Sequence, residues 1–177
     1  ATMKQYSFHT IVTADPHAFH CLKNEYNEFG GHYNVQHHTG FFAELVRQNK
    51  LKLDNSKELA LTYHDPCYLG RYNGEYDAPR FLLESLGGKI NEMERSKKTA
   101  RCCGGGGGAP VTDIPGKQRI PDMRMADVIE TNAEIVAVAC PQCNLMLEGV
   151  VGPRPEVKDI AELMVDALIE DVAGSDS

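Results

Sequence analysis

Five of the six cysteines in this sequence fall in a pattern that suggests a metal site. Cys67 is followed after 34 residues by the adjacent pair Cys102-Cys103, and after 36 further residues Cys140 and Cys143 form a Cys-x2-Cys pair. Soft thiolates select zinc, copper(I) or iron–sulfur clusters. A tetrahedral zinc site takes four ligands, so five cysteines are one too many. We therefore expect a cluster of several irons, in which one thiolate can bridge two of them. A structural zinc site and a thiol–disulfide enzyme are the alternatives.

A run of five glycines, residues 104–108, directly follows the adjacent pair. It lacks the Lys-Ser/Thr that completes a phosphate-binding P-loop, so we do not expect nucleotide binding there. Glycine lets the backbone approach a ligand closely and adopt positive φ. Gly104, Gly105 and Gly106 are therefore predicted to direct backbone N–H groups at cluster sulfur, an interaction that tunes a reduction potential.

The elements that must position these residues alternate between short β-branched segments and amphipathic segments of helical length. This alternation predicts an α/β fold with a mostly parallel sheet. Strands are expected at 8–13, 34–38, 59–64, 89–93 and 135–139, and helices at 16–26, 40–49, 79–86, 123–131, 141–149 and 158–172.

Three of these strands end in similar proline turns. The turns are Asp15-Pro16-His17-Ala18, Asp65-Pro66-Cys67-Tyr68 and Cys140-Pro141-Gln142-Cys143. Proline suits the first position of a helix, and the aspartates before it are expected to be N-caps. Each turn cysteine then lies at a helix N-terminus, beyond the carboxyl end of a strand. Open α/β sheets bind ligands at that edge, and the positive helix end favours the thiolate. The sequence therefore predicts one site at this edge.

The spacing, together with the string Cys102-Cys103-Gly104-Gly105-Gly106, resembles the cysteine-rich CCG domain of heterodisulfide reductase B subunits and related iron–sulfur oxidoreductases. The resemblance covers nearly the whole chain. It implies two Rossmann-like α/β halves with short, mostly parallel sheets and a ligand site at the carboxyl ends of the strands. It also implies one [4Fe-4S] cluster, cubane or non-cubane. The metal ligands carried over from the family are Cys67, Cys102, Cys103, Cys140 and Cys143.

The two halves differ in what the resemblance assigns to them. Residues 58–177 match an intact cluster-binding half, and residues 1–57 match the C-terminal remnant of a degenerate first half. In the first turn Asp15 and Ala18 stand where the family has cysteines, so we expect no second cluster. The match also implies that the chain is the C-terminal part of a longer iron–sulfur protein.

The function implied by the resemblance is electron transfer, as a component of a larger oxidoreductase whose substrate the sequence does not name. The implied partners are a ferredoxin-type iron–sulfur domain or a flavoprotein. The net charge of −7 argues against nucleic acid as a partner. The first residues given do not show the basic-then-apolar pattern expected of a secretion signal, and no run of about 18 apolar residues predicts a transmembrane segment in this chain. We expect a cytoplasmic location, at the cytoplasmic face of the membrane if the parent protein is membrane-linked.

A few other residues near the turns are candidates for secondary roles. His17 and His64 are candidates for hydrogen bonding near the cluster or for proton transfer, and the pair His37-His38 is expected to cap a helix. Cys21 is expected to be a small buried hydrophobe. The residues expected at the mouth of the site are Tyr68, Arg71 and Tyr72.

Overall fold

The computed structural model describes residues 2–112 and 115–169. Its strands are β1 (Ile11–Thr13), β2 (Val35–His37), β3 (Leu59–Tyr63), β4 (Gly88–Ile90), β5 (Ile135–Val138) and β6 (Glu156–Asp159). They form two sheets, one with the order β1-β2 and one with the order β4-β3-β5-β6. Every pairing within the two sheets is parallel. The predicted α/β class with two short parallel sheets is confirmed.

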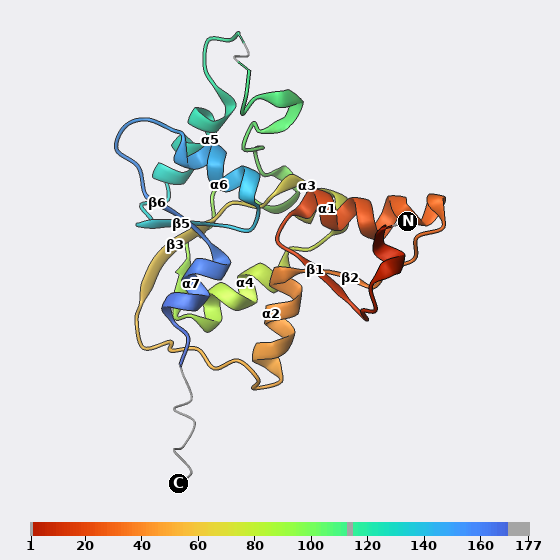
Figure 1. Cartoon of the computed structure of the whole chain (residues 1–177). Coiled ribbons are helices and arrows are strands. Elements are labelled where there is room, and N and C mark those ends of the chain that lie inside the picture. Colours follow the sequence, from red (N-terminus) through yellow and green to blue (C-terminus); the bar gives the residue numbers. More distant parts are fainter. Residues whose placement is uncertain (1, 113–114, 170–177) are drawn as a thin grey trace.

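Helices connect and cover the strands (Figure 1). They are α1 (Pro16–His20), α2 (His38–Arg47), α3 (Cys67–Asn73), α4 (Asp77–Ser85), α5 (Ile120–Ile129), α6 (Pro141–Glu148) and α7 (Ile160–Asp166). A π-helical turn, Cys21–Glu25, continues α1. Single 3-10 turns lie at Thr2–Gln5, Tyr26–Phe29, Lys97–Thr99 and Gly106–Gly108.

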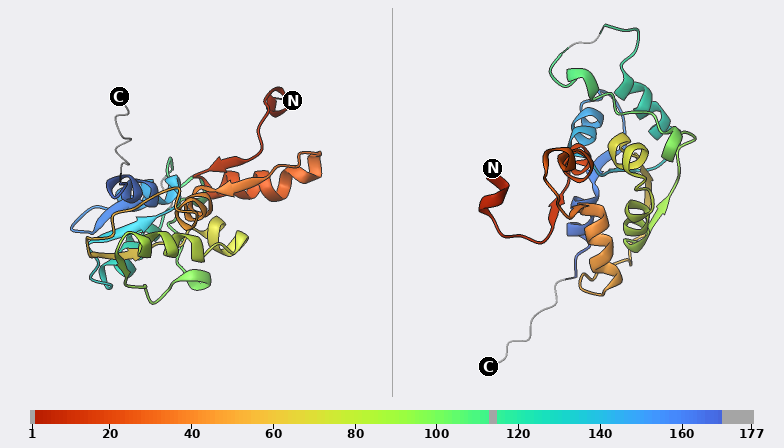
Figure 2. Two further views of the ribbon diagram at one scale, coloured as in Figure 1. Left: turned by 90° about the horizontal axis from the view of Figure 1, so that it is seen from below. Right: turned by 90° about the vertical axis from the view of Figure 1, so that its right-hand side faces the viewer.

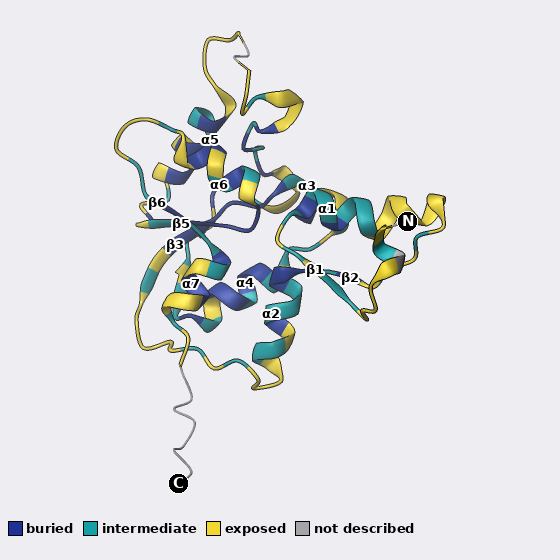
Figure 3. Ribbon diagram, viewed as in Figure 1, coloured by how far each residue is buried: buried dark blue, intermediate teal, exposed yellow. Residues whose placement is uncertain are grey.

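The four-stranded sheet is covered on both faces, which explains the nearly continuous apolar sequences of its central strands β3 and β5. Successive side chains of β5 point to opposite faces: Ala137 packs in the cluster that contains α4 and α7, and Val136 packs in the cluster that contains α5 and α6. Residues 61–63 of β3 and 136–138 of β5 are accordingly fully buried (Figure 3).

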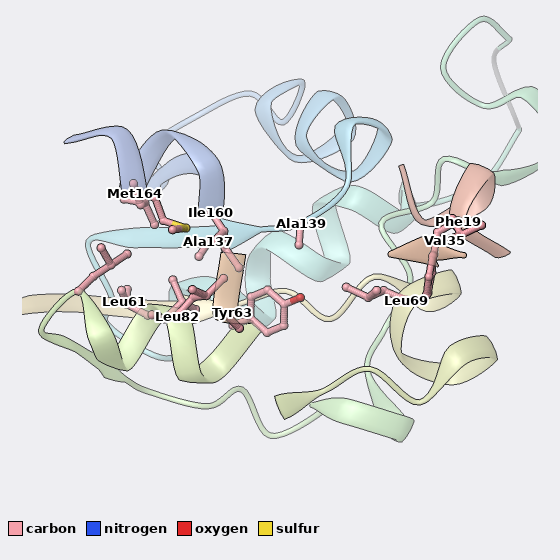
Figure 4. Packing of buried hydrophobic residues seen from close by; sticks show 14 residues of the cluster. Phe19, Val35, Leu61, Tyr63, Leu69, Leu82, Ala137, Ala139, Ile160 and Met164 are labelled. Atoms are coloured by element: carbon pink, nitrogen blue, oxygen red, sulfur yellow. The ribbon is translucent and has the colours of Figure 1, made fainter. Parts of the chain in front are cut away.

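The two-stranded sheet lies beside the larger sheet (Figure 2). Helix α2 packs on α4, and α1 packs on α3. One hydrophobic cluster runs through both regions: Phe19 and Val35 belong to it together with Leu69, Leu61 and Ile160 (Figure 4). The halves at 1–57 and 58–177 therefore share a core, and their standing as separate domains stays a prediction.

Two details differ from the predicted elements, whereas the helix start expected at Cys67 is confirmed by α3. Of the expected strand 8–13 only Ile11–Thr13 forms. The expected helix 158–172 begins at Ile160, because Glu156–Asp159 pairs with β5 as a strand. Asp159 then starts the helix with a capping box. The predicted C-terminal end of this helix, at residue 172, falls outside the described residues.

Candidate metal centre

The turns that follow β3 and β5 are brought together by parallel pairing. Tyr63 is in register with Ala137, so the residues that follow both strands leave the sheet at the same edge. Cys67 is the first residue of α3, and Cys140 is the N-cap of α6 with Pro141 in the first turn. The sheet topology thus places two ends of the cysteine pattern side by side.

All five predicted cysteines line one small cavity of about 80 Å³. A cavity needs a volume of roughly 10–15 Å³ to hold one water molecule, so this larger cavity admits a group of several atoms. The remaining lining residues come from the three proline turns and the glycine run: Pro16, His17, Pro66, Tyr68, Gly105, Gly106 and Gln142. Cys103, Cys140 and Cys143 are buried, and Cys67 and Cys102 are partly buried.

The five thiols interact in an unbroken series and share their charge unevenly. Cys103 and Cys67 both stabilise the thiolate of Cys102, so the pKa of Cys102 lies far below its usual value. The proximity of Cys102 raises the pKa of Cys67 strongly and that of Cys103 to about 11. At the other end, the Cys143 thiol lowers the pKa of Cys140, while its interactions with Cys103 and Cys140 raise its own.

This division of charge is what crowding requires. Like charges at close range disfavour ionisation, so five neighbouring sulfurs cannot all become thiolates unless positive charge lies among them. Metal ions supply that charge and bind the deprotonated ligand. The donor set, five soft sulfurs around one small cavity, fits an iron–sulfur cluster.

The glycine run closes one side of the cavity. The Gly104 N–H donates to the Cys102 sulfur at 3.4 Å. Gly104 has φ +84°, and a Cβ there would lie 2.9 Å from Ile120 and Pro121. Gly105 is buried, and its carbonyl accepts a hydrogen bond from the Gln142 side chain. Gly105 and Gly106 line the cavity, whereas Gly104 does not.

Two groups of possible metal ligands include residues other than cysteine. A ring nitrogen of His64 and the sulfurs of Cys103 and Cys143 lie within 4.8 Å of one another. Atoms of Asp15, His17 and Cys140 are equally close to one another. In the second group, however, His17 Nδ1 is already paired with Asp15 Oδ1 at 3.0 Å.

Asp15 is the N-cap of α1, as predicted, since Oδ1 accepts the His17 N–H at 2.9 Å. The same prediction for Asp65 is wrong, because Pro66 occupies the N-cap position of α3. The buried Asp65 carboxylate instead forms two bonds to Arg80, at 2.8 and 3.0 Å, and accepts the Lys97 N–H at 2.8 Å.

The other candidates take mainly structural positions. Cys21 is half-buried outside the site and donates to Glu25 at 3.1 Å, so its prediction as a buried hydrophobe is wrong. His37 occupies the N-cap position of α2, as expected, but its side chain makes no capping bond and instead bonds to Thr39 and to a backbone carbonyl. The ring of Tyr68 lies at the cavity, between those of His17 and Tyr72. Arg71 is exposed and donates to the Ala100 carbonyl at 2.7 Å.

Two residues at the site were not predicted. Gln142 lies between Cys140 and Cys143, and this position in the sequence could have indicated a role at the site. Its side chain donates to the Gly105 carbonyl and so connects α6 to the glycine run. Arg124 is fully buried on α5, and its Nε donates to His64 Nδ1 at 3.0 Å. These residues are 60 positions apart, so no local pattern announces the pair.

The fold and the cysteine site together define a cysteine-rich α/β domain. Residues 61–148, which include all five cavity cysteines, match the family described as CCG, a cysteine-rich domain. The chain belongs to this cysteine-rich CCG-domain family.

Several relatives are iron–sulfur or electron-transfer proteins by name. The chain is 56% identical over 176 residues to a probable membrane-anchored ferredoxin of Chromohalobacter salexigens, covering 94% of this chain and 26% of that protein. It is 37% identical over 179 residues to an EtfAB:quinone oxidoreductase of Syntrophomonas wolfei, covering 94% and 25%. With one component of the dihydromethanophenazine:CoB–CoM heterodisulfide reductase of Methanosarcina barkeri it shares 40% over 147 residues, covering 77% and 34%. The chain thus spans about a quarter to a third of the length of these relatives.

Proposed function

We propose that Cys67, Cys102, Cys103, Cys140 and Cys143 ligate one [4Fe-4S] cluster and that the chain transfers electrons as a component of a larger iron–sulfur oxidoreductase. The observation that carries the proposal is the convergence of all five cysteines on one small cavity. A bound cluster supplies one-electron redox chemistry, and the chain holds it, shields it and sets its potential.

The number of sulfurs favours a non-cubane arrangement. A cubane [4Fe-4S] cluster takes one cysteine at each of its four irons, which leaves one of the five thiolates unused. Each of the five cavity thiols interacts with the next, in the order Cys67, Cys102, Cys103, Cys143 and Cys140, so none of these five stands apart from the others. A thiolate that bridges two irons would use all five.

The names of the relatives indicate the redox setting. They include a ferredoxin, a quinone oxidoreductase linked to EtfAB and a component of a heterodisulfide reductase. We propose that the partners of this chain are a ferredoxin-type iron–sulfur domain and a flavoprotein in a heterodisulfide reductase-like or flavoprotein-linked system. The described residues contain no helix long and apolar enough to cross a bilayer. We place the chain at the cytoplasmic face of the membrane, held there by a membrane-linked parent protein.

Metal analysis of anaerobically purified protein tests the ligand set. The wild-type chain should be brown and contain about four irons and four sulfides. Each of the five cavity cysteines is replaced by serine in turn, and Cys21→Ser is the matched control because this cysteine lies outside the cavity.

Each cavity substitution should lower the iron content or change the EPR spectrum, and Cys21→Ser should do neither. One cavity cysteine that can be replaced without effect would indicate a four-ligand cubane cluster. One zinc and no iron would establish the structural alternative. Metal-free protein with alkylation-sensitive disulfide reduction would establish the thiol–disulfide alternative.

A further inference from the structure

The hydrogen bond between Arg124 and His64 fixes where the imidazole carries its proton. Arg124 Nε donates to His64 Nδ1 at 3.0 Å. A guanidinium has donors and no acceptor, so Nδ1 must accept with its lone pair. An imidazolium has N–H groups at both nitrogens and cannot accept this bond. His64 is therefore the neutral tautomer with its proton on Nε2.

The surroundings of Arg124 hold this bond in place. The Arg124 side chain is fully buried; its second nitrogen donates to the Arg95 carbonyl at 2.9 Å and lies 3.3 Å from Asp127 Oδ2. Asp127 also accepts from Arg101, the residue before Cys102, at 3.1 Å. Two residues of α5, Arg124 and Asp127, thus contact both His64 and Arg101, the residue that leads into the adjacent cysteines.

The remaining ring nitrogen of His64 is a donor without an acceptor. His64 Nε2 is buried and has no hydrogen-bond partner among the described residues. Leaving a buried donor unsatisfied costs about 1–3 kcal/mol. Sulfur is the kind of acceptor that the site offers, because a ring nitrogen of His64 lies within 4.8 Å of both the Cys103 and Cys143 sulfurs.

We infer that His64 is not an iron ligand but a fixed Nε2–H donor that hydrogen-bonds to a sulfur of the bound cluster or of its thiolates and raises the reduction potential. The inference rests on the proposed cluster. Metal coordination needs a nitrogen lone pair, and the one on Nδ1 already accepts from Arg124. A hydrogen bond to sulfur stabilises the reduced form, which carries more negative charge.

Two substitutions separate the donor from the bulk of the ring. His64→Phe retains an aromatic ring and removes the N–H. His64→Gln places an amide that can accept from Arg124 and present an N–H near the Nε2 position. Iron and sulfide are measured first in the wild type and in both variants. Redox titration and pulsed EPR of the reduced clusters follow, before and after exchange into deuterated buffer.

All three proteins should contain equal amounts of iron. The potential should move to a more negative value in His64→Phe and return toward the wild-type value in His64→Gln. The wild type should show an exchangeable proton coupled to the cluster, and His64→Phe should lack it. The coupling to the imidazole nitrogen should be weak, as expected across a hydrogen bond.

A strong coupling from a directly bonded nitrogen would overturn the inference and leave the cluster proposal intact. Equal potentials in the wild type and His64→Phe would do the same. If His64→Phe does not fold, the wild-type nitrogen coupling decides alone. Wild-type protein without iron would refute the proposed function itself, and the inference with it.

Discussion

The ion pair between Asp65 and Arg80 should be one of the strongest supports of the site. The Asp65 side chain is 2% exposed and that of Arg80 10%. Two parallel hydrogen bonds join the carboxylate to the guanidinium, and the same carboxylate also accepts the Lys97 N–H. The pair thereby fixes both the turn before Cys67 and the segment that leads to Cys102. We predict that Asp65→Asn, which keeps the shape and removes the charge, destabilises the protein substantially.

The magnitude follows from the burial of the pair. Removing one partner of a buried ion pair costs about 3–5 kcal/mol. The lower end applies here, because Glu92 also contacts Arg80, at 2.6 and 3.0 Å, and still neutralises it. In a protein of this size about 1 kcal/mol corresponds to roughly 2–4 °C in Tm. Asp65→Asn should therefore lower Tm by roughly 6–12 °C.

Glu92→Gln is the matched control, because it removes the other carboxylate from the same arginine. The Glu92 side chain is 37% exposed, and ion pairs open to solvent contribute about 0–1 kcal/mol. Thermal and urea unfolding are measured on samples of equal iron content, since a bound metal stabilises the folded state by itself. Equal losses in the two variants, or a loss below about 1 kcal/mol in Asp65→Asn, would refute the reasoning from burial.

Three further outcomes are expected. Asp15→Ala removes the N-cap of α1 and should cost about 1 kcal/mol in the free energy of unfolding without changing the iron content; iron loss would show that the first half binds metal. Gly104→Ala places a side chain at φ +84° against the start of α5 and should cost at least about 1–2 kcal/mol, whereas Gly106→Ala meets no atom within 4 Å and should change Tm little; equal Tm values would contradict this. Burial lowers the pKa of His37 from 6.5 to about 3, so below pH 6.5 the unfolded chain takes up a proton that the folded chain does not, and the free energy of unfolding falls by up to about 1.4 kcal/mol per pH unit. The free energy of unfolding, measured with urea at several pH values, should depend less steeply on pH in His37→Gln. An unchanged pH dependence would exclude His37 as its source.

Much of the site could be predicted because its signals are local. The apolar strands β3 and β5 each end in a turn with proline, and parallel pairing carries both turns to one edge. The proline turn predicted where α3 begins but not how far it extends, because its seven residues include Gly70 and two tyrosines, a composition with little helical signal. Strand β6 was missed because a four-residue edge strand with three charged residues reads as the beginning of the next helix.

The pairs that position the site could not be predicted, because each depends on a contact between distant segments. Asp65 stands before proline as an N-cap would, and only the folded chain shows that its carboxylate is paired with Arg80. Arg124 reads as an exposed residue of an amphipathic helix, yet it is fully buried against His64. Sequence patterns reveal the residues that can bind metal more readily than they reveal the residues that hold those ligands in position.

The proline turn that contains no cysteine, Asp15-Pro16-His17-Ala18, also forms part of the cavity. Pro16 and His17 line it, and the His17 ring lies 4.2 Å from that of Tyr68, measured between centroids. A shortened protein lacking residues 1–57 would retain every sulfur of the site but expose its contents to water on that side. Exposure to solvent is one of the factors that set the potential of an iron–sulfur cluster. The half that supplies no cavity cysteine would therefore help to set the reduction potential of the proposed cluster.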